Sequence, residues 1–192
     1  VLRQPIEDRK ITISRAMKSV DYPANFMLVG AMNPSPNGDF QDLNFENPEE
    51  SYKVKKYLSK LSGPLMDRID IQIEVLPVSF EELSSEKQAE ESLSVQKRVI
   101  ASRNKQICRY KTYKIYNNAQ LTPSLIDVYC KLDKDSLSLL EKAVYSMNLS
   151  ARSFTRIKKV ARTIADLDNS TDIQIKHLAE AIQYRKLDRL KL

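Results

Sequence analysis

The spacing of apolar residues changes once along this chain, near residue 76, and that change limits what the chain can fold into. Before it, residues 11–14 and 19–22 alternate apolar and polar side chains around a short turn, which predicts a β-hairpin. Residues 26–32 form a continuous apolar run, typical of a strand buried on both faces of a parallel sheet. Residues 69–75 alternate again and predict another strand. The first part is therefore predicted to be part of an α/β sheet domain.

Two helices are predicted within this first part. Residues 2–8 are typical of the last turns of a helix, although Pro5 limits how much of it is regular. Pro48 is suited to open a second helix that continues to about Lys60, and Gly63–Pro64 is expected to end it.

From Phe80 onward the pattern is helical almost throughout. A long helix is predicted from three apolar residues spaced seven apart on one side, Leu93, Ile100 and Ile107. Later helices are predicted to begin at four capping residues: Thr122, Asp133, Ser150, and Thr171 with Gln174 in a capping box. The fold class is thus α/β plus all-α, divided into residues 1–76 (α/β core), 77–119 (linker with a long basic helix) and 120–192 (helical bundle).

The composition, 42% apolar and 29% charged, is that of a globular protein. No apolar run approaches the roughly 20 residues that cross a bilayer, so we expect no membrane partner and a cytoplasmic location. The chain opens on Val1 in the middle of a pattern, which indicates a processed chain or a fragment. Cys108 and Cys130 lack metal-ligand spacing, and the single His177 is predicted to be an ordinary helix position.

Positive charge is concentrated in the second part of the chain. Residues 1–76 carry 10 basic and 11 acidic side chains, whereas residues 77–192 carry 21 and 14. Residues 97–116 hold seven cations and no acid, with three tyrosines interleaved, and such a stretch can bind nucleic acid through phosphate contacts and base stacking. A solvated helix face followed by a tyrosine-anchored loop explains the same pattern. The candidate contacts are Arg103, Lys105 and Arg109, together with Arg15 and Lys18 at the hairpin turn.

Asn33 follows the predicted buried strand directly, in the sequence Met32–Asn33–Pro34. Ligands of open α/β sheets bind outside the carboxyl ends of the strands. An asparagine there offers both a donor and an acceptor, so it can orient a water molecule against a phosphate. An Asn-Pro turn that simply ends a strand is the alternative.

Two arginines complete the set of candidate catalytic residues. Arg68 lies between Asp67 and Asp70 just before a predicted strand, and it is either a locally paired surface residue or an arginine finger that stabilises a transferring phosphoryl group. Arg152 falls in the first turn of the helix capped by Ser150, where a cation opposes the helix dipole. A bound anion would turn both the dipole and the arginine into attractions, so this position favours a phosphate partner.

Seven segments of the chain, taken in their order along the sequence, resemble the magnesium-chelatase-like family of AAA+ ATPases. The bacterial members of this family include competence-associated proteins. The matching segments are VLRQPIED (1–8), TISRA (12–16), AMNP (31–34), LSGPLMDRID (61–70), LSAR (149–152), VARTIADL (160–167) and HLAEAIQYRKLD (177–188). The resemblance implies that Asn33 is sensor 1, Arg68 the arginine finger and Arg152 the sensor 2 arginine. It also implies a presensor hairpin at residues 11–22, facing the central pore of a homo-oligomeric ring that is expected to be a hexamer.

The chain departs from the family pattern at the nucleotide site. It contains no G-x-x-x-x-G-K-[ST] loop and only three glycines, and it has no acidic strand end that would hold magnesium. In the family both motifs lie upstream, so ATP and Mg²⁺ are expected to bind the full-length protein but not to bind this chain tightly. Many relatives also carry cysteines after the Asn-Pro turn, and this chain has none there, so we expect no zinc and no other metal site.

Three functions agree with these observations. The first is an ATP-driven ring motor acting on DNA during recombination of incoming strands. The second is the ATPase subunit of a chelatase that inserts magnesium into a porphyrin. The third is a helical nucleic-acid-binding module without enzymatic activity, which would bind DNA as an isolated chain with a steep salt dependence.

Overall fold

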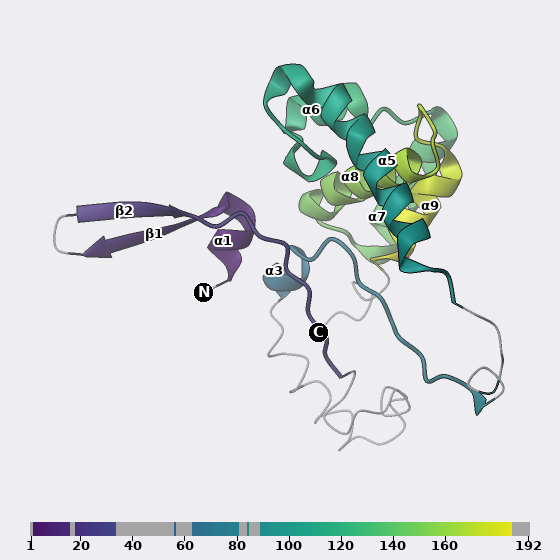
Figure 1. The fold of residues 1–192 in the computed structure, drawn as a ribbon, viewed down its shortest axis with the longest axis horizontal. Helices are drawn as coiled ribbons and strands as arrows, with labels where there is room; N and C mark the ends of the chain where they lie inside the picture. The colour runs from purple at the N-terminus through teal and green to yellow at the C-terminus, as the bar shows by residue number, and fades with distance from the viewer. Residues whose placement is uncertain are drawn as a thin grey trace. The chain divides into compact units, whose positions relative to one another are not determined.

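The computed structural model describes residues 2–15, 18–33, 56, 63–80, 84 and 89–185. The chain divides into two compact units. The first comprises Val1–Ile69 with Leu190–Leu192, and the second comprises Asp70–Arg189. Figure 1 shows the hairpin and short helices of the first unit and the helices of the second.

The first unit begins with a short helix that leads directly into a hairpin. Helix α1 (Arg3–Asp8) ends at Arg9, whose backbone is left-handed (φ 55°) and whose N–H donates to the carbonyl of Pro5 at 3.0 Å. Strands β1 (Lys10–Arg15) and β2 (Lys18–Pro23) then pair antiparallel, in a register that runs from Lys10 opposite Pro23 to Arg15 opposite Lys18. The predicted hairpin is therefore present; its place in a ring pore stays a prediction.

The hairpin has one polar face and one apolar face. On the polar face, Asp21 accepts hydrogen bonds from Lys10 Nζ at 2.7 Å and from Thr12 Oγ1 at 2.6 Å, which lowers the pKa of Asp21. On the other face Ile11 lies opposite Tyr22, and Ile13 lies opposite Val20. These four apolar side chains are 42–54% exposed, so the described part of the chain leaves this face largely uncovered.

The prediction of two sheet strands after the hairpin is wrong for the described residues. Residues 24–33 and 71–79 have no regular secondary structure, and their apolar side chains are exposed: Met27 is 87% and Val75 78% exposed. A strand needs a neighbouring backbone to satisfy its N–H and C=O groups. Within the described ranges the only sheet is the pair β1–β2, so these runs have no strand to pair with. An apolar sequence pattern alone cannot supply that partner.

Gly63–Pro64 begins a short helix, and its predicted role in ending the helix before it falls outside the described residues. Helix α3 (Gly63–Met66) starts at this pair, which is consistent with the preference of proline for the first turn. The helix predicted from Pro48 to Lys60 lies outside the described residues except at Lys56.

The second unit is a bundle of helices. Its α-helices are α5 (Ser92–Tyr110), α6 (Pro123–Tyr129), α7 (Lys134–Met147), α8 (Ala151–Leu167) and α9 (Ile175–Gln183), with short 3₁₀ helices η2 (Lys111–Tyr113) and η3 (Asn118–Gln120) between α5 and α6. Three of the predicted N-cap residues do precede a helix in the structure. Asp133 accepts from the N–H of Ser136 at 2.7 Å, Ser150 accepts from that of Ser153 at 3.2 Å, and Thr122 precedes α6 without a side-chain cap bond.

The core of this unit lies between α8 and its neighbours. Leu140 of α7, Ile157 and Ala161 of α8, and Leu178 of α9 are at most 1% exposed and belong to one hydrophobic cluster. Burial of such side chains supplies the main driving force for packing these helices. No helix among the described residues is both long and apolar enough to span a bilayer.

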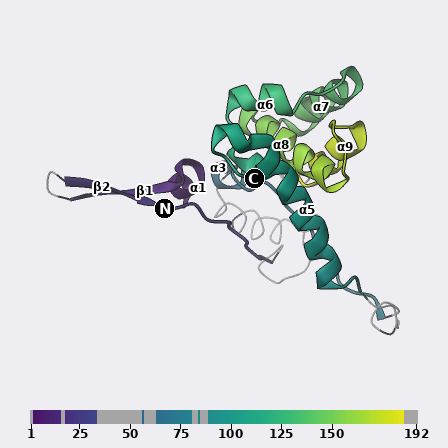
Figure 2. The same ribbon diagram turned by 45° about the horizontal axis from the view of Figure 1, so that its top comes forward.

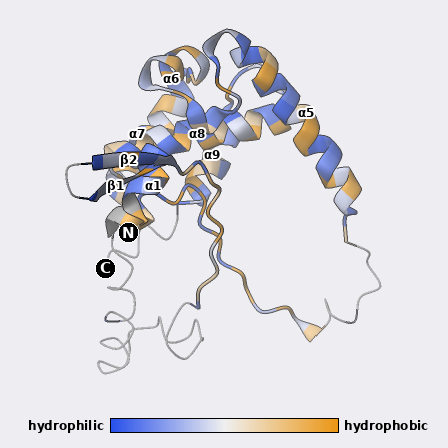
Figure 3. Cartoon of the chain, turned by 60° about the vertical axis from the view of Figure 1, so that its left-hand side comes forward, coloured by the Kyte–Doolittle hydropathy of each residue, from blue (hydrophilic) through white to orange (hydrophobic). Residues whose placement is uncertain are grey.

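Helix α5 packs with a different face from the one its apolar spacing suggests. Its buried residues are Ser102, Gln106 and Tyr110, whereas Leu93, Ile100 and Ile107 are 44–56% exposed. Figure 2 shows that the N-terminal turns of α5 extend beyond the other helices of this unit, and Figure 3 shows mixed hydropathy along the extended part.

The N-terminus of α9 also differs from the prediction. Its cap is Gln174 rather than Thr171, and the reciprocal partner is His177, whose Nδ1 accepts the Gln174 N–H at 3.0 Å. His177 is 2% exposed, and its Nε2 lies 2.8 Å from Oδ2 of Asp168. Because Nδ1 accepts, Nε2 carries the proton and donates to Asp168. His177 is therefore a position in a helix, as predicted, and its buried side chain is also part of the cap.

Candidate functional site

Arg68 lies in the turn that follows α3, where its N–H donates to the carbonyl of Leu65 at 2.9 Å. Its guanidinium contacts Glu7 of α1: Nε donates to Oε2 at 2.9 Å, and Nη2 forms a second, shorter bond to the same oxygen. The Arg68 side chain is 10% exposed and that of Glu7 is 37% exposed. In the first unit the guanidinium is thus held by a carboxylate of its own chain.

Asn33 is the last residue of the described range 18–33. It lies beyond the apolar run in the first unit, and its side chain is exposed. The strand that was predicted to present it is absent, so its placement at the carboxyl end of a sheet strand stays a prediction.

Arg152 occupies the first turn of α8 in the second unit, as predicted, and is exposed. No acidic residue lies in that turn, and Ser150 caps the helix by accepting from Ser153 N–H at 3.2 Å. The positive end of the helix dipole and the guanidinium therefore coincide at the surface, which is an arrangement suited to an anion such as phosphate. Because Asn33 and Arg68 belong to the first unit, the convergence of the three residues on one nucleotide stays a prediction.

A buried arginine lies beneath this helix start. Arg185 is 0% exposed, and its Nη2 donates to Oγ of Ser153 at 3.1 Å. Ser153 is itself fully buried, and its Oγ lies 3.2 Å from that of Ser150. Arg185 thus fixes the turn that carries Arg152. The sequence pattern gave no signal for this contact, since Ser153 and Arg185 are 32 positions apart.

The basic segment contains a buried ionic network centred on Asp166 of α8. Arg109 of α5 donates two hydrogen bonds to this carboxylate in a bidentate contact, from Nη1 to Oδ2 at 2.9 Å and from Nη2 to Oδ1 at 2.5 Å. Asn118 donates to Oδ2 at 2.9 Å, and Arg162 Nε donates to Oδ1 at 3.2 Å. Lys105 Nζ donates to the backbone carbonyl of Asp166 at 2.9 Å. Two of the candidate nucleic-acid contacts, Lys105 and Arg109, are therefore engaged in holding α5 against α8.

The charges of this network stabilise one another. Burial alone would raise the pKa of Asp166, but the hydrogen bonds from Arg109 and Asn118 and the charge of Arg162 outweigh it and hold that pKa below its ordinary value. The same carboxylate raises the pKa of Arg109, against the opposing effect of burial. The sequence contained one local signal, the i,i+4 spacing of Arg162 and Asp166, but nothing local pairs either of them with Arg109.

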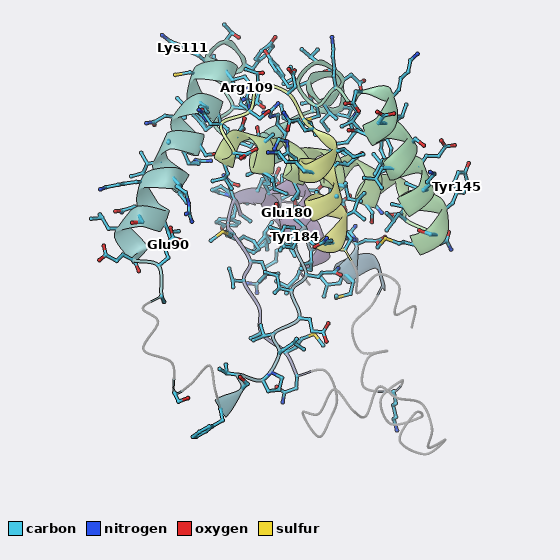
Figure 4. The ribbon with its side chains drawn as sticks, turned by 90° about the vertical axis from the view of Figure 1, so that its right-hand side faces the viewer. Glu90, Arg109, Lys111, Tyr145, Glu180 and Tyr184 are labelled. Atoms are coloured by element: carbon cyan, nitrogen blue, oxygen red, sulfur yellow. The ribbon has the colours of Figure 1, made fainter. Side chains whose placement is uncertain are left out.

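Other basic residues of this segment remain at the surface. Arg103 and Lys111 are exposed, and Tyr113 and Tyr116 are 46% and 59% exposed. Figure 4 shows Lys111 near the C-terminal end of α5, close to the labelled Arg109. We refer to these four exposed side chains of α5, η2 and the segment after η2 together as the α5 surface: Arg103, Lys111, Tyr113 and Tyr116. A mixture of exposed cations and aromatic rings is able to contact phosphates and bases.

The hairpin turn is a second cationic surface. Arg15 and Lys18 are exposed and lie directly opposite each other across β1 and β2. Like charges at directly opposed positions destabilise a strand pair. A polyanion bound at this end of the hairpin would remove that repulsion.

Within the ranges that the structure describes, no three His, Cys, Asp or Glu side chains gather in a way that could hold a metal ion. The described residues therefore supply cations that can meet phosphate groups, but not a set of ligands for Mg²⁺.

Both parts of the chain match models of one protein family. Residues 89–185 match the model described as magnesium chelatase, subunit ChlI C-terminal. Residues 1–83 match the model described as magnesium chelatase, subunit ChlI.

Bacterial proteins are similar over nearly the whole chain. Uncharacterized protein YifB of Salmonella typhimurium is 41% identical over 191 residues, which cover 98% of this chain and 36% of that relative. Competence protein ComM of Haemophilus influenzae is 42% identical over 191 residues, with the same coverage of each chain. The chain thus spans 36% of the length of these relatives.

Proposed function

This chain belongs to the magnesium chelatase ChlI family, and we propose that it supplies the residues that trigger nucleotide hydrolysis in a AAA+ ATPase that remodels DNA. The observation that carries the proposal is Arg152, a surface cation in the acid-free first turn of the capped helix α8. An arginine there opposes the helix dipole unless an anion is bound, and a nucleotide phosphate is such an anion.

Each candidate residue has a role in this proposal. Asn33 orients the attacking water, Arg152 senses the terminal phosphate, and Arg68 stabilises the charge that develops on the transferring phosphoryl group. Bound ATP with Mg²⁺ supplies the phosphoryl group to be transferred. The 192 residues contain no phosphate-cradling G-x-x-x-x-G-K-[ST] loop, so the cradle and the ligands of Mg²⁺ belong to another part of the full-length protein. We expect this chain alone to show no ATP hydrolysis above background.

We propose further that the subunits assemble into a ring, a hexamer, in which Arg68 serves the nucleotide of a neighbour. The contact of Arg68 with Glu7 supports a device that can be released, because the Glu7 carboxylate is 37% exposed and water can solvate it when the guanidinium leaves. A planar guanidinium that leaves one carboxylate can meet a phosphoryl group with the same donors.

DNA is the client that the surface of the chain favours. The α5 surface and the opposed Arg15 and Lys18 are exposed and cationic, and residues 77–192 carry 21 basic against 14 acidic side chains. The printed name of one relative, a competence protein, points in the same direction.

A porphyrin chelatase is the second candidate function, since the matching family models carry that name. The motor chemistry would be the same, but the client would be a protein–porphyrin complex. A chelatase subunit would stimulate magnesium insertion and would not require DNA. ATP turnover measured with and without DNA therefore distinguishes the two functions, because only a DNA-remodelling ATPase is expected to respond to DNA.

The proposal is tested in the full-length protein with Arg68→Ala and Arg152→Ala. Loss of an arginine finger lowers turnover by about 10³-fold or more, so Arg68→Ala should reach that range while ATP affinity and thermal stability are kept. Arg98→Ala is a matched control, because Arg98 is an exposed α5 residue whose pair with Glu90 (2.6 and 3.0 Å) lies outside the candidate set. Unchanged turnover in Arg68→Ala, or unfolding of that variant, would overturn the proposal.

A further inference from the structure

The end of α9 is fixed against α8 within the second unit. Leu178 of α9 and Ile157 of α8 are at most 1% exposed and belong to the same hydrophobic cluster. In the turn that follows α9, the N–H of Arg185 donates to the carbonyl of Ile182 at 3.0 Å. The backbone of Arg185 is therefore held at a defined place beside α8.

From this place the side chain of Arg185 reaches the first turn of α8. Its Nη2 donates to Oγ of Ser153 at 3.1 Å, and both residues are 0% exposed. A guanidinium has donors only, so the hydroxyl oxygen is the acceptor in this bond. Breaking a buried hydrogen bond leaves a donor that water cannot reach, which costs more than breaking an exposed one. We therefore expect this contact to stay formed in the folded protein.

Ser150 and Ser153 enclose the position of Arg152 in the chain. The N–H of Ser153 donates to Oγ of the N-cap Ser150 at 3.2 Å, and the two hydroxyl oxygens also lie 3.2 Å apart. Arg152 stands between these residues, in the same turn of helix. Its backbone is thus fixed by the cap on one side and by the buried contact with Arg185 on the other.

We propose that Arg185 and Ser153 are positioning residues for Arg152, and that they hold the first turn of α8 where the Arg152 guanidinium meets the terminal phosphate of the nucleotide. This inference rests on the proposed function of Arg152. Both residues are fully buried, so they act on hydrolysis through Arg152 and not by touching the nucleotide. Misplacing a positioned group by about 1 Å can cost about 100-fold in rate, so loss of the buried contact has a measurable effect.

The test compares Ser153→Ala with the matched control Ser136→Ala in the full-length protein. Both serines are 0% exposed, and each is the third residue of a helix whose cap accepts its N–H. The hydroxyl of Ser136 makes no hydrogen bond to the part of the chain that the structure describes. Ser153→Ala should therefore lower kcat by about 10- to 100-fold, whereas Ser136→Ala should leave it unchanged.

A second readout is specific to the terminal phosphate. It is the Kd of ADP divided by the Kd of a non-hydrolysable ATP analogue, because only the terminal phosphate distinguishes these two ligands. Ser153→Ala should lower this ratio, as should Arg152→Ala and Arg185→Met, which removes the donors of the buried guanidinium. Ser136→Ala should keep the wild-type ratio. Because Arg185 is buried, the smaller change, Ser153→Ala, decides the outcome.

A double-mutant cycle separates positioning from general loss of structure. If Ser153 acts through Arg152, the variant that carries both Arg152→Ala and Ser153→Ala should have the kcat and the affinity ratio of Arg152→Ala alone. The inference is overturned if Ser153→Ala lowers kcat equally in the Arg152→Ala background. It is also overturned if Arg152→Ala lowers the affinity ratio and Ser153→Ala does not. An unchanged ratio in Arg152→Ala itself would instead refute the proposed function of Arg152.

Discussion

The Nε–H of Arg68 donates to Oε2 of Glu7 at 2.9 Å, between residues that are 61 positions apart in the sequence. This contact joins α1 to the turn after α3 within the first unit. A side chain that is 10% exposed and paired with its own chain cannot act as the proposed arginine finger on a neighbouring subunit without first leaving that partner. If Arg68 has the proposed role, Glu7 is therefore expected to set how readily its guanidinium becomes available.

Glu7→Gln should raise the ATP turnover of the full-length protein. Removing the charge of Glu7 weakens this ion pair, so the population of released Arg68, and with it kcat, should rise, by about fivefold for each 1 kcal/mol that the pair loses. Steady-state ATPase kinetics measure the effect. Asp8→Asn, the same charge change at the next residue of α1, is the control and should leave kcat unchanged. A decrease in kcat for Glu7→Gln would show that the pair positions Arg68 productively rather than restraining it.

Asp166→Ala should destabilise the helical unit strongly. Asp166 is 1% exposed, and removing it leaves the buried Arg162 and the partly buried Arg109 without their shared carboxylate. Breaking a buried ion pair from one side destabilises by roughly 3–5 kcal/mol. Urea unfolding of the 192-residue chain measures the loss. Arg103→Ala, an exposed change on α5, should stay within about 0.5 kcal/mol of the wild type. Equal stability of the two variants would contradict the network's structural role.

Arg103→Ala and Lys111→Ala should weaken DNA binding without loss of stability. Each exposed cation that contacts a phosphate releases counterions, so its removal should reduce the slope of log K against log salt by about 1. Fluorescence anisotropy with a labelled oligonucleotide at several salt concentrations measures that slope. Lys142→Ala removes an exposed lysine of α7 and is the control. If the control lowers the slope as much, binding follows the net charge and not the α5 surface.

Asp168 should make part of the stability depend on acid pH. Hydrogen bonds from Lys176 Nζ (2.6 Å) and His177 Nε2 (2.8 Å) lower the pKa of Asp168 from 3.8 to about 2. Because the folded-state pKa is depressed, this contribution is complete above about pH 4 and is lost as the pH falls from 4 through 2. Unfolding free energies measured across that range should fall less steeply in Asp168→Asn, and also in Lys176→Gln. Identical slopes in the wild type and Asp168→Asn would refute the assignment.

Features determined by adjacent residues could be predicted from the sequence. Asp133 and Ser150 cap α7 and α8 as expected, because a cap is a contact between residues three positions apart. The hairpin followed from alternation around a short turn, since its two strands supply each other's hydrogen-bond partners. The cap of α9 was misplaced because the ring nitrogen of His177, rather than the side chain of Thr171, meets the free N–H.

Features determined by distant residues could not be predicted. Residues 26–32 have the composition of a buried strand, but composition does not supply the neighbouring backbone that a strand needs. Among the candidate site residues, Arg152 lies in the expected helical turn, whereas the engagement of Arg109 and Lys105 by Asp166 depends on a contact between α5 and α8. The contact of Arg68 with Glu7 joins residues 61 positions apart, and no local pattern in the sequence indicates it.

The most direct test of the central claim mixes two inactive forms of the full-length protein. One carries Arg68→Ala, and the other carries an intact Arg68 but an inactivated phosphate-binding loop. If Arg68 acts on the nucleotide of a neighbouring subunit, mixed rings contain interfaces with both an intact loop and an intact arginine, and ATP turnover returns above that of either form alone. Turnover that stays at the level of the separate forms, in mixtures shown to co-assemble, would contradict the account.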